Sequence, residues 1–253
     1  METALASLLC TLAHIPTLVL RISPFRPILN TGQKKTLSAL YAVGLVFNFF
    51  LVWFLFRQGQ MDIGLYKIHL LVFCAIMGMV NILVVPGYWR EHMFSFGLTA
   101  MVFWLCFGVA AFTAGHFGLA SQSQMLILEN LLGLTLFSLL YPWSRRLAKT
   151  TVTPFLIQKN EKYWKTIWFV PIALFLSGIL SRGYQGYSHS VGDLVSILLV
   201  SIAAYLICRR VAQDYGALQE KEQLNRQVQL QKQYYRALTE AVEKERKQRH
   251  NFK

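Results

Sequence analysis

Residues 36–56 read TLSALYAVGLVFNFFLVWFLF, an apolar run without a single charged side chain. A helix needs about 20 predominantly apolar residues to cross the hydrocarbon core of a bilayer, and this run is long enough. The whole chain of 253 residues is 55% apolar and only 15% charged, whereas soluble domains carry about 25% charged residues. The protein surface must therefore face something other than water, and we expect an integral membrane protein.

Six further apolar blocks accompany this run. The first is preceded by Glu2 rather than by a basic region, so we expect a retained helix and not a cleaved secretory signal. Pro171 in the sixth block predicts a kink or a tilted, partly buried segment. The expected fold is an all-α integral membrane protein, in which residues 1–208 form a bundle of about seven transmembrane helices. The predicted spans are residues 4–20, 36–56, 67–85, 93–114, 124–141, 166–180 and 190–208.

Lysine and arginine residues predict the orientation of these spans, because short basic loops stay on the cytoplasmic side of a membrane. The first, third and fifth loops and the segment after the last block are basic. The only lysine and arginine residues in the other loops are Arg57, Lys67 and Arg182. The N-terminus is therefore expected outside and the C-terminus in the cytoplasm, and the net charge of +13 is assigned to the membrane and not to nucleic acid. The residues that carry this prediction are Arg21, Arg26, Lys34, Lys35, Arg90, Arg145, Arg146, Lys149, Lys159, Lys162, Lys165, Arg209 and Arg210.

The tail from residue 209 onward is rich in strong helix formers, lacks proline and has one glycine, Gly216. It predicts a cytoplasmic helix, called here the stalk, with a coiled-coil linker at residues 209–243 and a dimerisation helix beginning at 244–253. Because polar residues interrupt its heptad seam, a solvated single helix is the alternative to a parallel dimer. One seam position holds Val228, Tyr235, Val242 and Arg249, and the other holds Leu224, Gln231, Leu238, Glu245 and Phe252.

The last residues, KQRHNFK at 247–253, follow this heptad pattern directly. They resemble the start of the phosphoacceptor box of sensor histidine kinases in the peptide-pheromone receptor (accessory gene regulator) class, whose ATPase domains are of the GHKL type. WREHMF at 89–94 and TIWFVP at 166–171 are similar to the input bundles of these kinases. The resemblance extends loosely over the whole chain and closely over its last eight residues.

This resemblance implies a receptor of the bacterial plasma membrane, the input part of a two-component system, in which the stalk relays a signal to the phosphoacceptor His250. A phosphoacceptor must present a neutral ring nitrogen to the γ-phosphate of ATP, and His250 falls just outside the seam. The family has an acidic residue next, whereas Asn251 offers an amide oxygen to the ring proton but no negative charge. From the residues alone, a solvated histidine in a basic tail is the alternative.

The family's ATP-binding domain follows the box, and its nucleotide-binding sequences are not found in this chain. We therefore expect the input half of a kinase that cannot phosphorylate itself, with ATP used by a separate catalytic domain. The implied partners are a second copy of the chain, an ATP-binding kinase domain, a response regulator, and a peptide or membrane-soluble ligand. No cofactor or metal is expected, because the four cysteines have no metal-ligand spacing.

Charged side chains inside a membrane are expensive and are therefore candidate functional residues. Glu129 is the only acidic residue well inside an apolar block, and His116 ends the fourth block. Both lie toward the outer side of the predicted topology, so they are candidate ligand contacts in an outward-facing pocket. Interhelical hydrogen bonding is the alternative for both residues.

Two other function classes compete with a receptor. A small multi-span transporter or channel, oligomerised by its coil, would have internal repeats and broken helices near the midplane, and no convincing repeat relates the two halves. A membrane-bound enzyme would have clustered His, Asp or Glu residues on the cytoplasmic side, and the sequence lacks such clusters.

Overall fold

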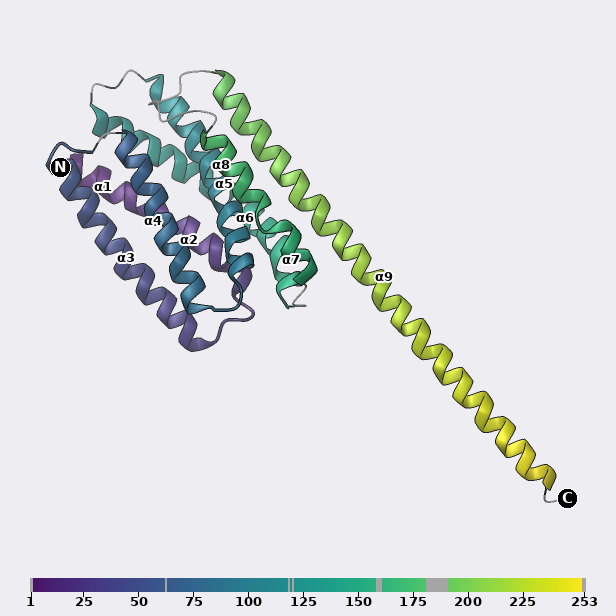
Figure 1. The fold of residues 1–253 in the computed structure, drawn as a ribbon. Coiled ribbons are helices and arrows are strands. Elements are labelled where there is room, and N and C mark those ends of the chain that lie inside the picture. Colours follow the sequence, from purple (N-terminus) through teal and green to yellow (C-terminus); the bar gives the residue numbers. More distant parts are fainter. Residues whose placement is uncertain are drawn as a thin grey trace. The chain divides into compact units, whose positions relative to one another are not determined.

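The computed structural model describes residues 2–61, 63–117, 119, 121–157, 161–180 and 191–251. Within these ranges all regular secondary structure is helical, without a β-strand, as the sequence predicts. The chain divides into two compact units, residues 1–209 and residues 210–253. Figure 1 shows the helices coloured along the chain.

The first unit begins with a broken helix and continues with four longer ones. A single long helix then begins in the first unit and ends in the second. In chain order the elements are α1 (Glu2–Leu12), α2 (His14–Ile22), the 3-10 turn η1 (Ser23–Phe25), α3 (Thr31–Arg57), α4 (Ile63–Val84), α5 (Trp89–Gly115), α6 (Gln122–Ile157), α7 (Glu161–Ile167), α8 (Val170–Leu180) and α9 (Val191–Asn251).

Four helical segments in the described part of the chain are long and apolar enough to cross a membrane. They are Glu2–Phe25, Thr31–Arg57, Trp89–Gly115 and Gln122–Ile157. Two shorter apolar helices, Ile68–Val84 and Tyr163–Leu176, lie below that length. The number of seven spans and their orientation therefore stay predictions.

Prolines mark two of the breaks between helices. Pro16 cannot donate to the carbonyl of Leu12 and its ring crowds that carbonyl, and α1 ends at Leu12. The chain also turns at Trp168 and Phe169, just before Pro171 in the first turn of α8. The kink predicted at Pro171 is confirmed as a break between α7 and α8.

Two predicted loop assignments are wrong. Arg145, Arg146 and Lys149 lie inside α6, which continues through Pro142 and Pro154 to Ile157. This extension has its own buried face, because Leu156 packs in a cluster with Phe25, Leu29, Leu37 and Val85. Arg21 lies in α2 and not in a loop, and its side chain is only 2% exposed. Tertiary packing thus extends the helices beyond the apolar blocks.

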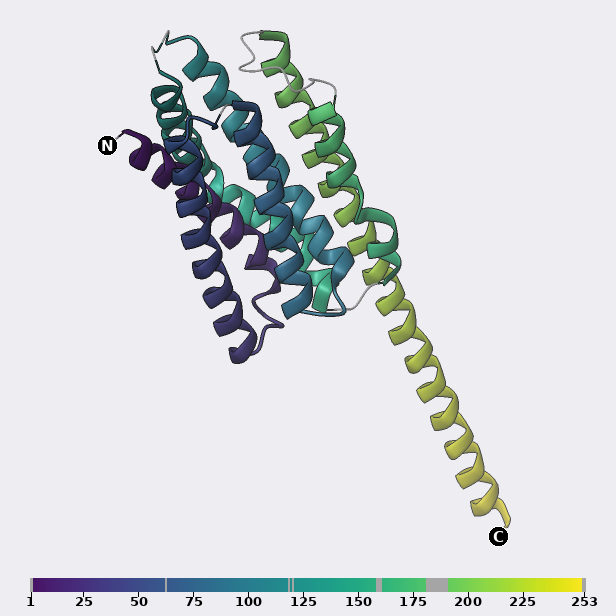
Figure 2. The ribbon, with the colours of Figure 1, turned by 60° about the vertical axis from the view of Figure 1, so that its left-hand side comes forward.

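Two glycines allow close contacts with α5. A Cβ atom at Gly133 of α6 would lie 2.6 Å from the ring of Phe107. A Cβ atom at Gly97 of α5 would lie 2.7 Å from the backbone nitrogen of Ile172 and 2.9 Å from the carbonyl carbon of Pro171. The backbones of α5 and α8 therefore approach each other only because residue 97 has no side chain. Elsewhere in the first unit, α3 and α4 run side by side along most of their length in both ribbon views (Figures 1 and 2).

We predict that Gly97→Ala destabilises the first unit by about 1–3 kcal/mol, because the added methyl group meets backbone atoms that cannot turn aside. The unfolding temperature of the purified chain in detergent measures this effect. Gly78→Ala in α4 is the matched control, since its Cβ atom would meet its nearest neighbour at an ordinary 3.5 Å. Equal unfolding temperatures for the two variants would contradict the predicted backbone contact.

Candidate functional site

Buried polar side chains from α1, α3, α4 and α6 gather near the end of the first unit at which α4 and α6 begin. Glu129 and Asn130 of α6 are 6% and 0% exposed, and Asn48 of α3 is also fully buried. We call this group the polar cluster. Its members are Cys10, Thr11, Asn48, Tyr66, His69, Glu129 and Asn130.

One half of the polar cluster joins α1, α4 and α6. The Tyr66 hydroxyl donates to Asn130 Oδ1 over 3.0 Å, and Asn130 Nδ2 donates to the Leu126 carbonyl over 2.7 Å and lies 3.5 Å from Cys10 Sγ. Glu129 lies within electrostatic range of both Cys10 and Tyr66. The carboxyl group of Glu129 thus lies near a thiol group of α1 and a hydroxyl group of α4.

The other half of the polar cluster joins α1, α3 and α4 through Asn48. Asn48 Nδ2 donates to Thr11 Oγ1 over 3.1 Å, and Asn48 Oδ1 lies 2.7 Å from His69 Nε2. This geometry requires the His69 tautomer with its proton on Nε2, because an amide oxygen can only accept. Asn48 therefore uses both ends of its amide to connect three helices.

A cluster of buried apolar side chains lies beside the polar cluster. Val52, Met61 and Leu126 are buried around Cys10 and Tyr66. Gln122 Nε2 donates to the Met61 carbonyl over 3.0 Å and so fastens the α3–α4 connection to the beginning of α6. The apolar and polar groups are therefore adjacent, because Cys10 and Tyr66 belong to both.

The two predicted ligand contacts, Glu129 and His116, have different surroundings in the structure. Glu129 belongs to the polar cluster, about 10 Å along α6 from its first residue. His116 is the exposed C-cap of α5, with Nδ1 2.8 Å from the Phe112 carbonyl and its ring 4.5 Å from the Phe112 ring. Asn48 and Asn130, the neighbour of Glu129, make interhelical hydrogen bonds. For Glu129 and His116 themselves, both the shared ligand pocket and interhelical hydrogen bonding stay predictions.

The predicted phosphoacceptor His250 and its neighbour Asn251 are the last residues of α9. Their backbone is helical, and their side chains lie outside the described part of the structure. Among the described residues, no group of three His, Cys, Asp or Glu side chains is placed to hold a metal ion. The roles of His250 and Asn251 therefore stay predictions.

Sequence reasoning missed Tyr66 and His69 of the polar cluster. Both lie in the first two turns of α4, around the beginning of the predicted span 67–85, and neither is charged or interrupts an apolar run. Their spacing of three residues places them on one face of a helix, which is the signal that could have found them. Only the packing of α4 against α1, α3 and α6 shows that this face is the inward one.

Comparisons of this chain with protein families, with curated proteins and with solved structures find no match. The function is therefore argued from the residues of the chain and their contacts.

We predict that Tyr66→Phe lowers the free energy of unfolding by about 1–3 kcal/mol, because it leaves the buried Asn130 Oδ1 without its donor. Thermal unfolding in detergent measures this loss. His116→Ala is the control and should stay within about 0.5 kcal/mol, because the His116 side chain is exposed. A neutral Tyr66→Phe would mean that the hydroxyl group does not hold α4 to α6.

Proposed function

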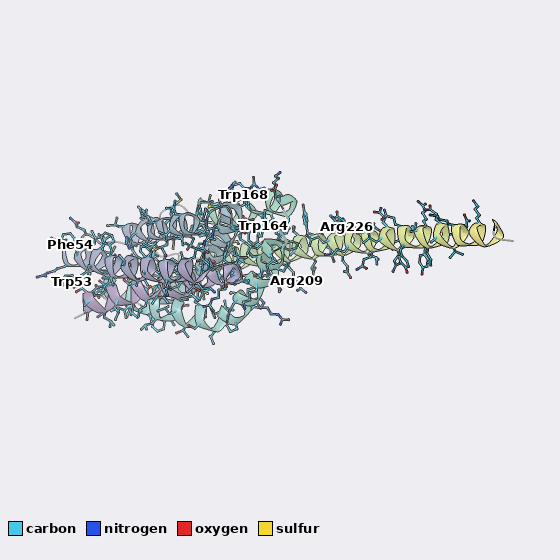
Figure 3. All side chains as sticks on the ribbon, turned by 90° about the horizontal axis from the view of Figure 1, so that it is seen from below. Trp53, Phe54, Trp164, Trp168, Arg209 and Arg226 are labelled. Atoms are coloured by element: carbon cyan, nitrogen blue, oxygen red, sulfur yellow. The ribbon has the colours of Figure 1, made fainter. Side chains whose placement is uncertain are left out.

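We propose that this chain is a membrane signal receptor, the input part of a two-component sensor histidine kinase. Residues 1–208 would cross the bacterial plasma membrane about seven times, with the N-terminus outside and the C-terminus in the cytoplasm. The four long apolar helices support the membrane placement. Aromatic residues at both ends of the first unit add to it: Trp53 and Phe54 lie at one end, and Trp164 and Trp168 lie toward the other (Figure 3).

Arginines beside these aromatic residues support the same placement. The guanidinium carbon of Arg57 lies 5.6 Å from the Trp53 ring, and that of Arg90 lies 5.0 Å from the Trp89 ring. Arg57 ends α3 and Arg90 begins α5, so both cations lie at helix ends where a long side chain can reach water. Such pairs are typical of the bilayer interface.

The observation that carries the proposal is the continuity of α9. This helix continues from the apolar segment beginning at Val191 to Asn251 and includes the Arg249-His250 pair. A helix is the stiffest connection that a single chain offers, so a rotation or shift of its first half is passed along its length. The histidine of the proposed phosphoacceptor box is therefore on the same helix as the last predicted span.

The first half of α9 contacts α6, one of the helices that carry the polar cluster. Tyr205 packs on Trp143 of α6 with ring centroids 4.7 Å apart, and Ala204 packs with Met101 and Phe175. Because α6 carries Glu129 near its beginning and Trp143 farther along, one helix reaches from the polar cluster to α9. We propose that a peptide or membrane-soluble ligand acts at the outer end, near Glu129 and His116, and repacks α6 against α9.

The second half of α9 would pair with that of another copy. Apolar side chains of its heptad seam are exposed in the single chain, with Leu224 59%, Leu238 49% and Val242 58% accessible. A parallel coiled coil buries such a seam against its partner. In the dimer His250 would receive the γ-phosphoryl group of ATP from a separate ATP-binding kinase domain and pass it to a response regulator, with Asn251 orienting the ring.

We predict that the chain, fused in natural helical phase to a GHKL-type ATPase domain and assayed in membranes with radiolabelled ATP, takes up phosphate on His250. His250→Gln should abolish the label, because glutamine has no nucleophilic ring nitrogen. Lys247→Gln is the control and should keep it. No label on an intact fusion that binds ATP would contradict the phosphoacceptor role and favour the transporter alternative.

We predict that Leu238→Cys forms a disulfide between two copies in membranes under mild oxidation, because residues at one seam position face each other in a parallel dimer. Non-reducing electrophoresis detects the crosslink. Glu240→Cys, two residues along and on the outer side of the predicted coil, is the control and should crosslink several-fold less. Equal crosslinking of the two variants would indicate a solvated single helix.

A further inference from the structure

Arg21 is a buried cation that has no carboxylate partner among the described residues. It lies in α2 and is 2% exposed. Its Nη1 donates to the Cys74 carbonyl of α4 over 3.1 Å, and its guanidinium carbon lies 4.6 Å from the centroid of the Phe96 ring of α5. Its Nε has no hydrogen-bond partner among the described residues, whose ion pairs do not include Arg21. A buried charge is costly without a counter-ion, so this site calls for an anion.

A second donor without a partner among the described residues is linked to Arg21 through Tyr41. Asn81 of α4 is fully buried; its Oδ1 accepts from the Tyr41 hydroxyl, and its Nδ2 has no partner among the described residues. Tyr41 is in turn within electrostatic range of Arg21. Cys74, Gly78 and Asn81 follow one another on one face of α4. We call Arg21, Tyr41 and Asn81 the Arg21 cluster, and the free N–H groups of Arg21 and Asn81 fit an occupant that accepts several hydrogen bonds.

The position of the Arg21 cluster along the helices indicates which anion it meets. Arg21 precedes Phe25, the end of the first candidate span, by one turn, and Asn81 lies within one turn of the end of α4. These positions are about 4–6 Å from the helix ends, so in a spanning bundle the Arg21 cluster would lie near the interface, just inside the level of the lipid phosphates. Exposed basic residues flank the same end and attract anionic lipid to it: Arg26, Lys34 and Lys35.

Gly78 and Phe96 form the cover of the Arg21 cluster between α4 and α5. A Cβ atom at Gly78 would lie 3.6 Å from Arg21 Nη1 and 3.5 Å from Phe96 Cδ2, so the missing side chain leaves space beside both groups. Both Gly78 and Phe96 are half-buried, whereas Arg21 behind them is buried. Because the Phe96 ring packs on the Arg21 guanidinium, rotation of this ring would uncover the guanidinium on the side of Gly78.

We propose that the Arg21 cluster binds the phosphate group of an anionic membrane lipid, admitted between α4 and α5 when Phe96 turns aside. Arginine suits this role because its planar fork of donors matches two phosphate oxygens. The free Nε would donate to one oxygen and Asn81 Nδ2 to another. The inference uses the membrane placement proposed above and does not depend on the receptor role, so a failed phosphotransfer to His250 leaves it standing.

The test reconstitutes the full chain in nanodiscs of phosphatidylcholine, with or without phosphatidylglycerol, and counts retained lipids by native mass spectrometry. The wild-type chain is expected to retain phosphatidylglycerol in preference to phosphatidylcholine. Arg21→Met should weaken that retention about tenfold or more, as the loss of one buried charge-assisted contact predicts. Arg26→Met, an exposed arginine at the same end, is the control and should weaken it less than about threefold.

Two further measurements keep the test decisive. Gly78→Leu keeps the charge but fills the space beside Phe96, so it should also lose phosphatidylglycerol, and it replaces Arg21→Met if that variant does not fold. Inorganic phosphate is added to wild-type chain in phosphatidylcholine alone; protection from thermal unfolding there, lost in Arg21→Met, would assign the site to free phosphate and overturn the lipid. Equal retention by wild type, Arg21→Met and Gly78→Leu would make Arg21 only a clamp on the Cys74 carbonyl.

Discussion

The first unit depends on one constraint: its buried polar groups have no water to bind and must find hydrogen-bond partners within the protein. Where a chain is surrounded by hydrocarbon, each backbone N–H and C=O group must find its partner within the protein, and an α-helix satisfies them all locally. The same constraint acts on polar side chains in the apolar segments. Asn48 and Asn130 therefore direct their amides at other helices and so fix the neighbours of α1.

Helix breaks and close contacts give this unit its particular packing. Pro16 and Pro171 lie where helices begin again after a break, whereas Pro142 and Pro154 are tolerated inside α6. Neighbouring helices hold a proline-containing helix in place when its side chains pack well, as the buried Leu156 does. Gly97 acts on the distance between helices, because its missing side chain allows the backbones of α5 and α8 to touch.

The two polar groups of the first unit lie toward opposite ends and differ in character. The polar cluster contains an acid, Glu129, among hydroxyl, thiol and amide groups, and its hydrogen bonds close largely on themselves. The Arg21 cluster contains a cation and unused donors. In the proposed receptor, a ligand near the polar cluster would alter the contact of α6 with α9. The Arg21 cluster would bind an anionic lipid of the surrounding membrane.

The sequence by itself determined the helical class, the apolar blocks, the break at Pro171 and the helical tail, because each follows from local composition and from the length a bilayer demands. It also indicated Glu129, since a charge inside an apolar block is conspicuous without any structure. Only the tertiary structure placed Tyr66 and His69 beside the asparagines and buried Arg21, because the inward face of a helix is decided by its neighbours and not by its own residues. For the same reason α6 continues past the apolar block that predicted it.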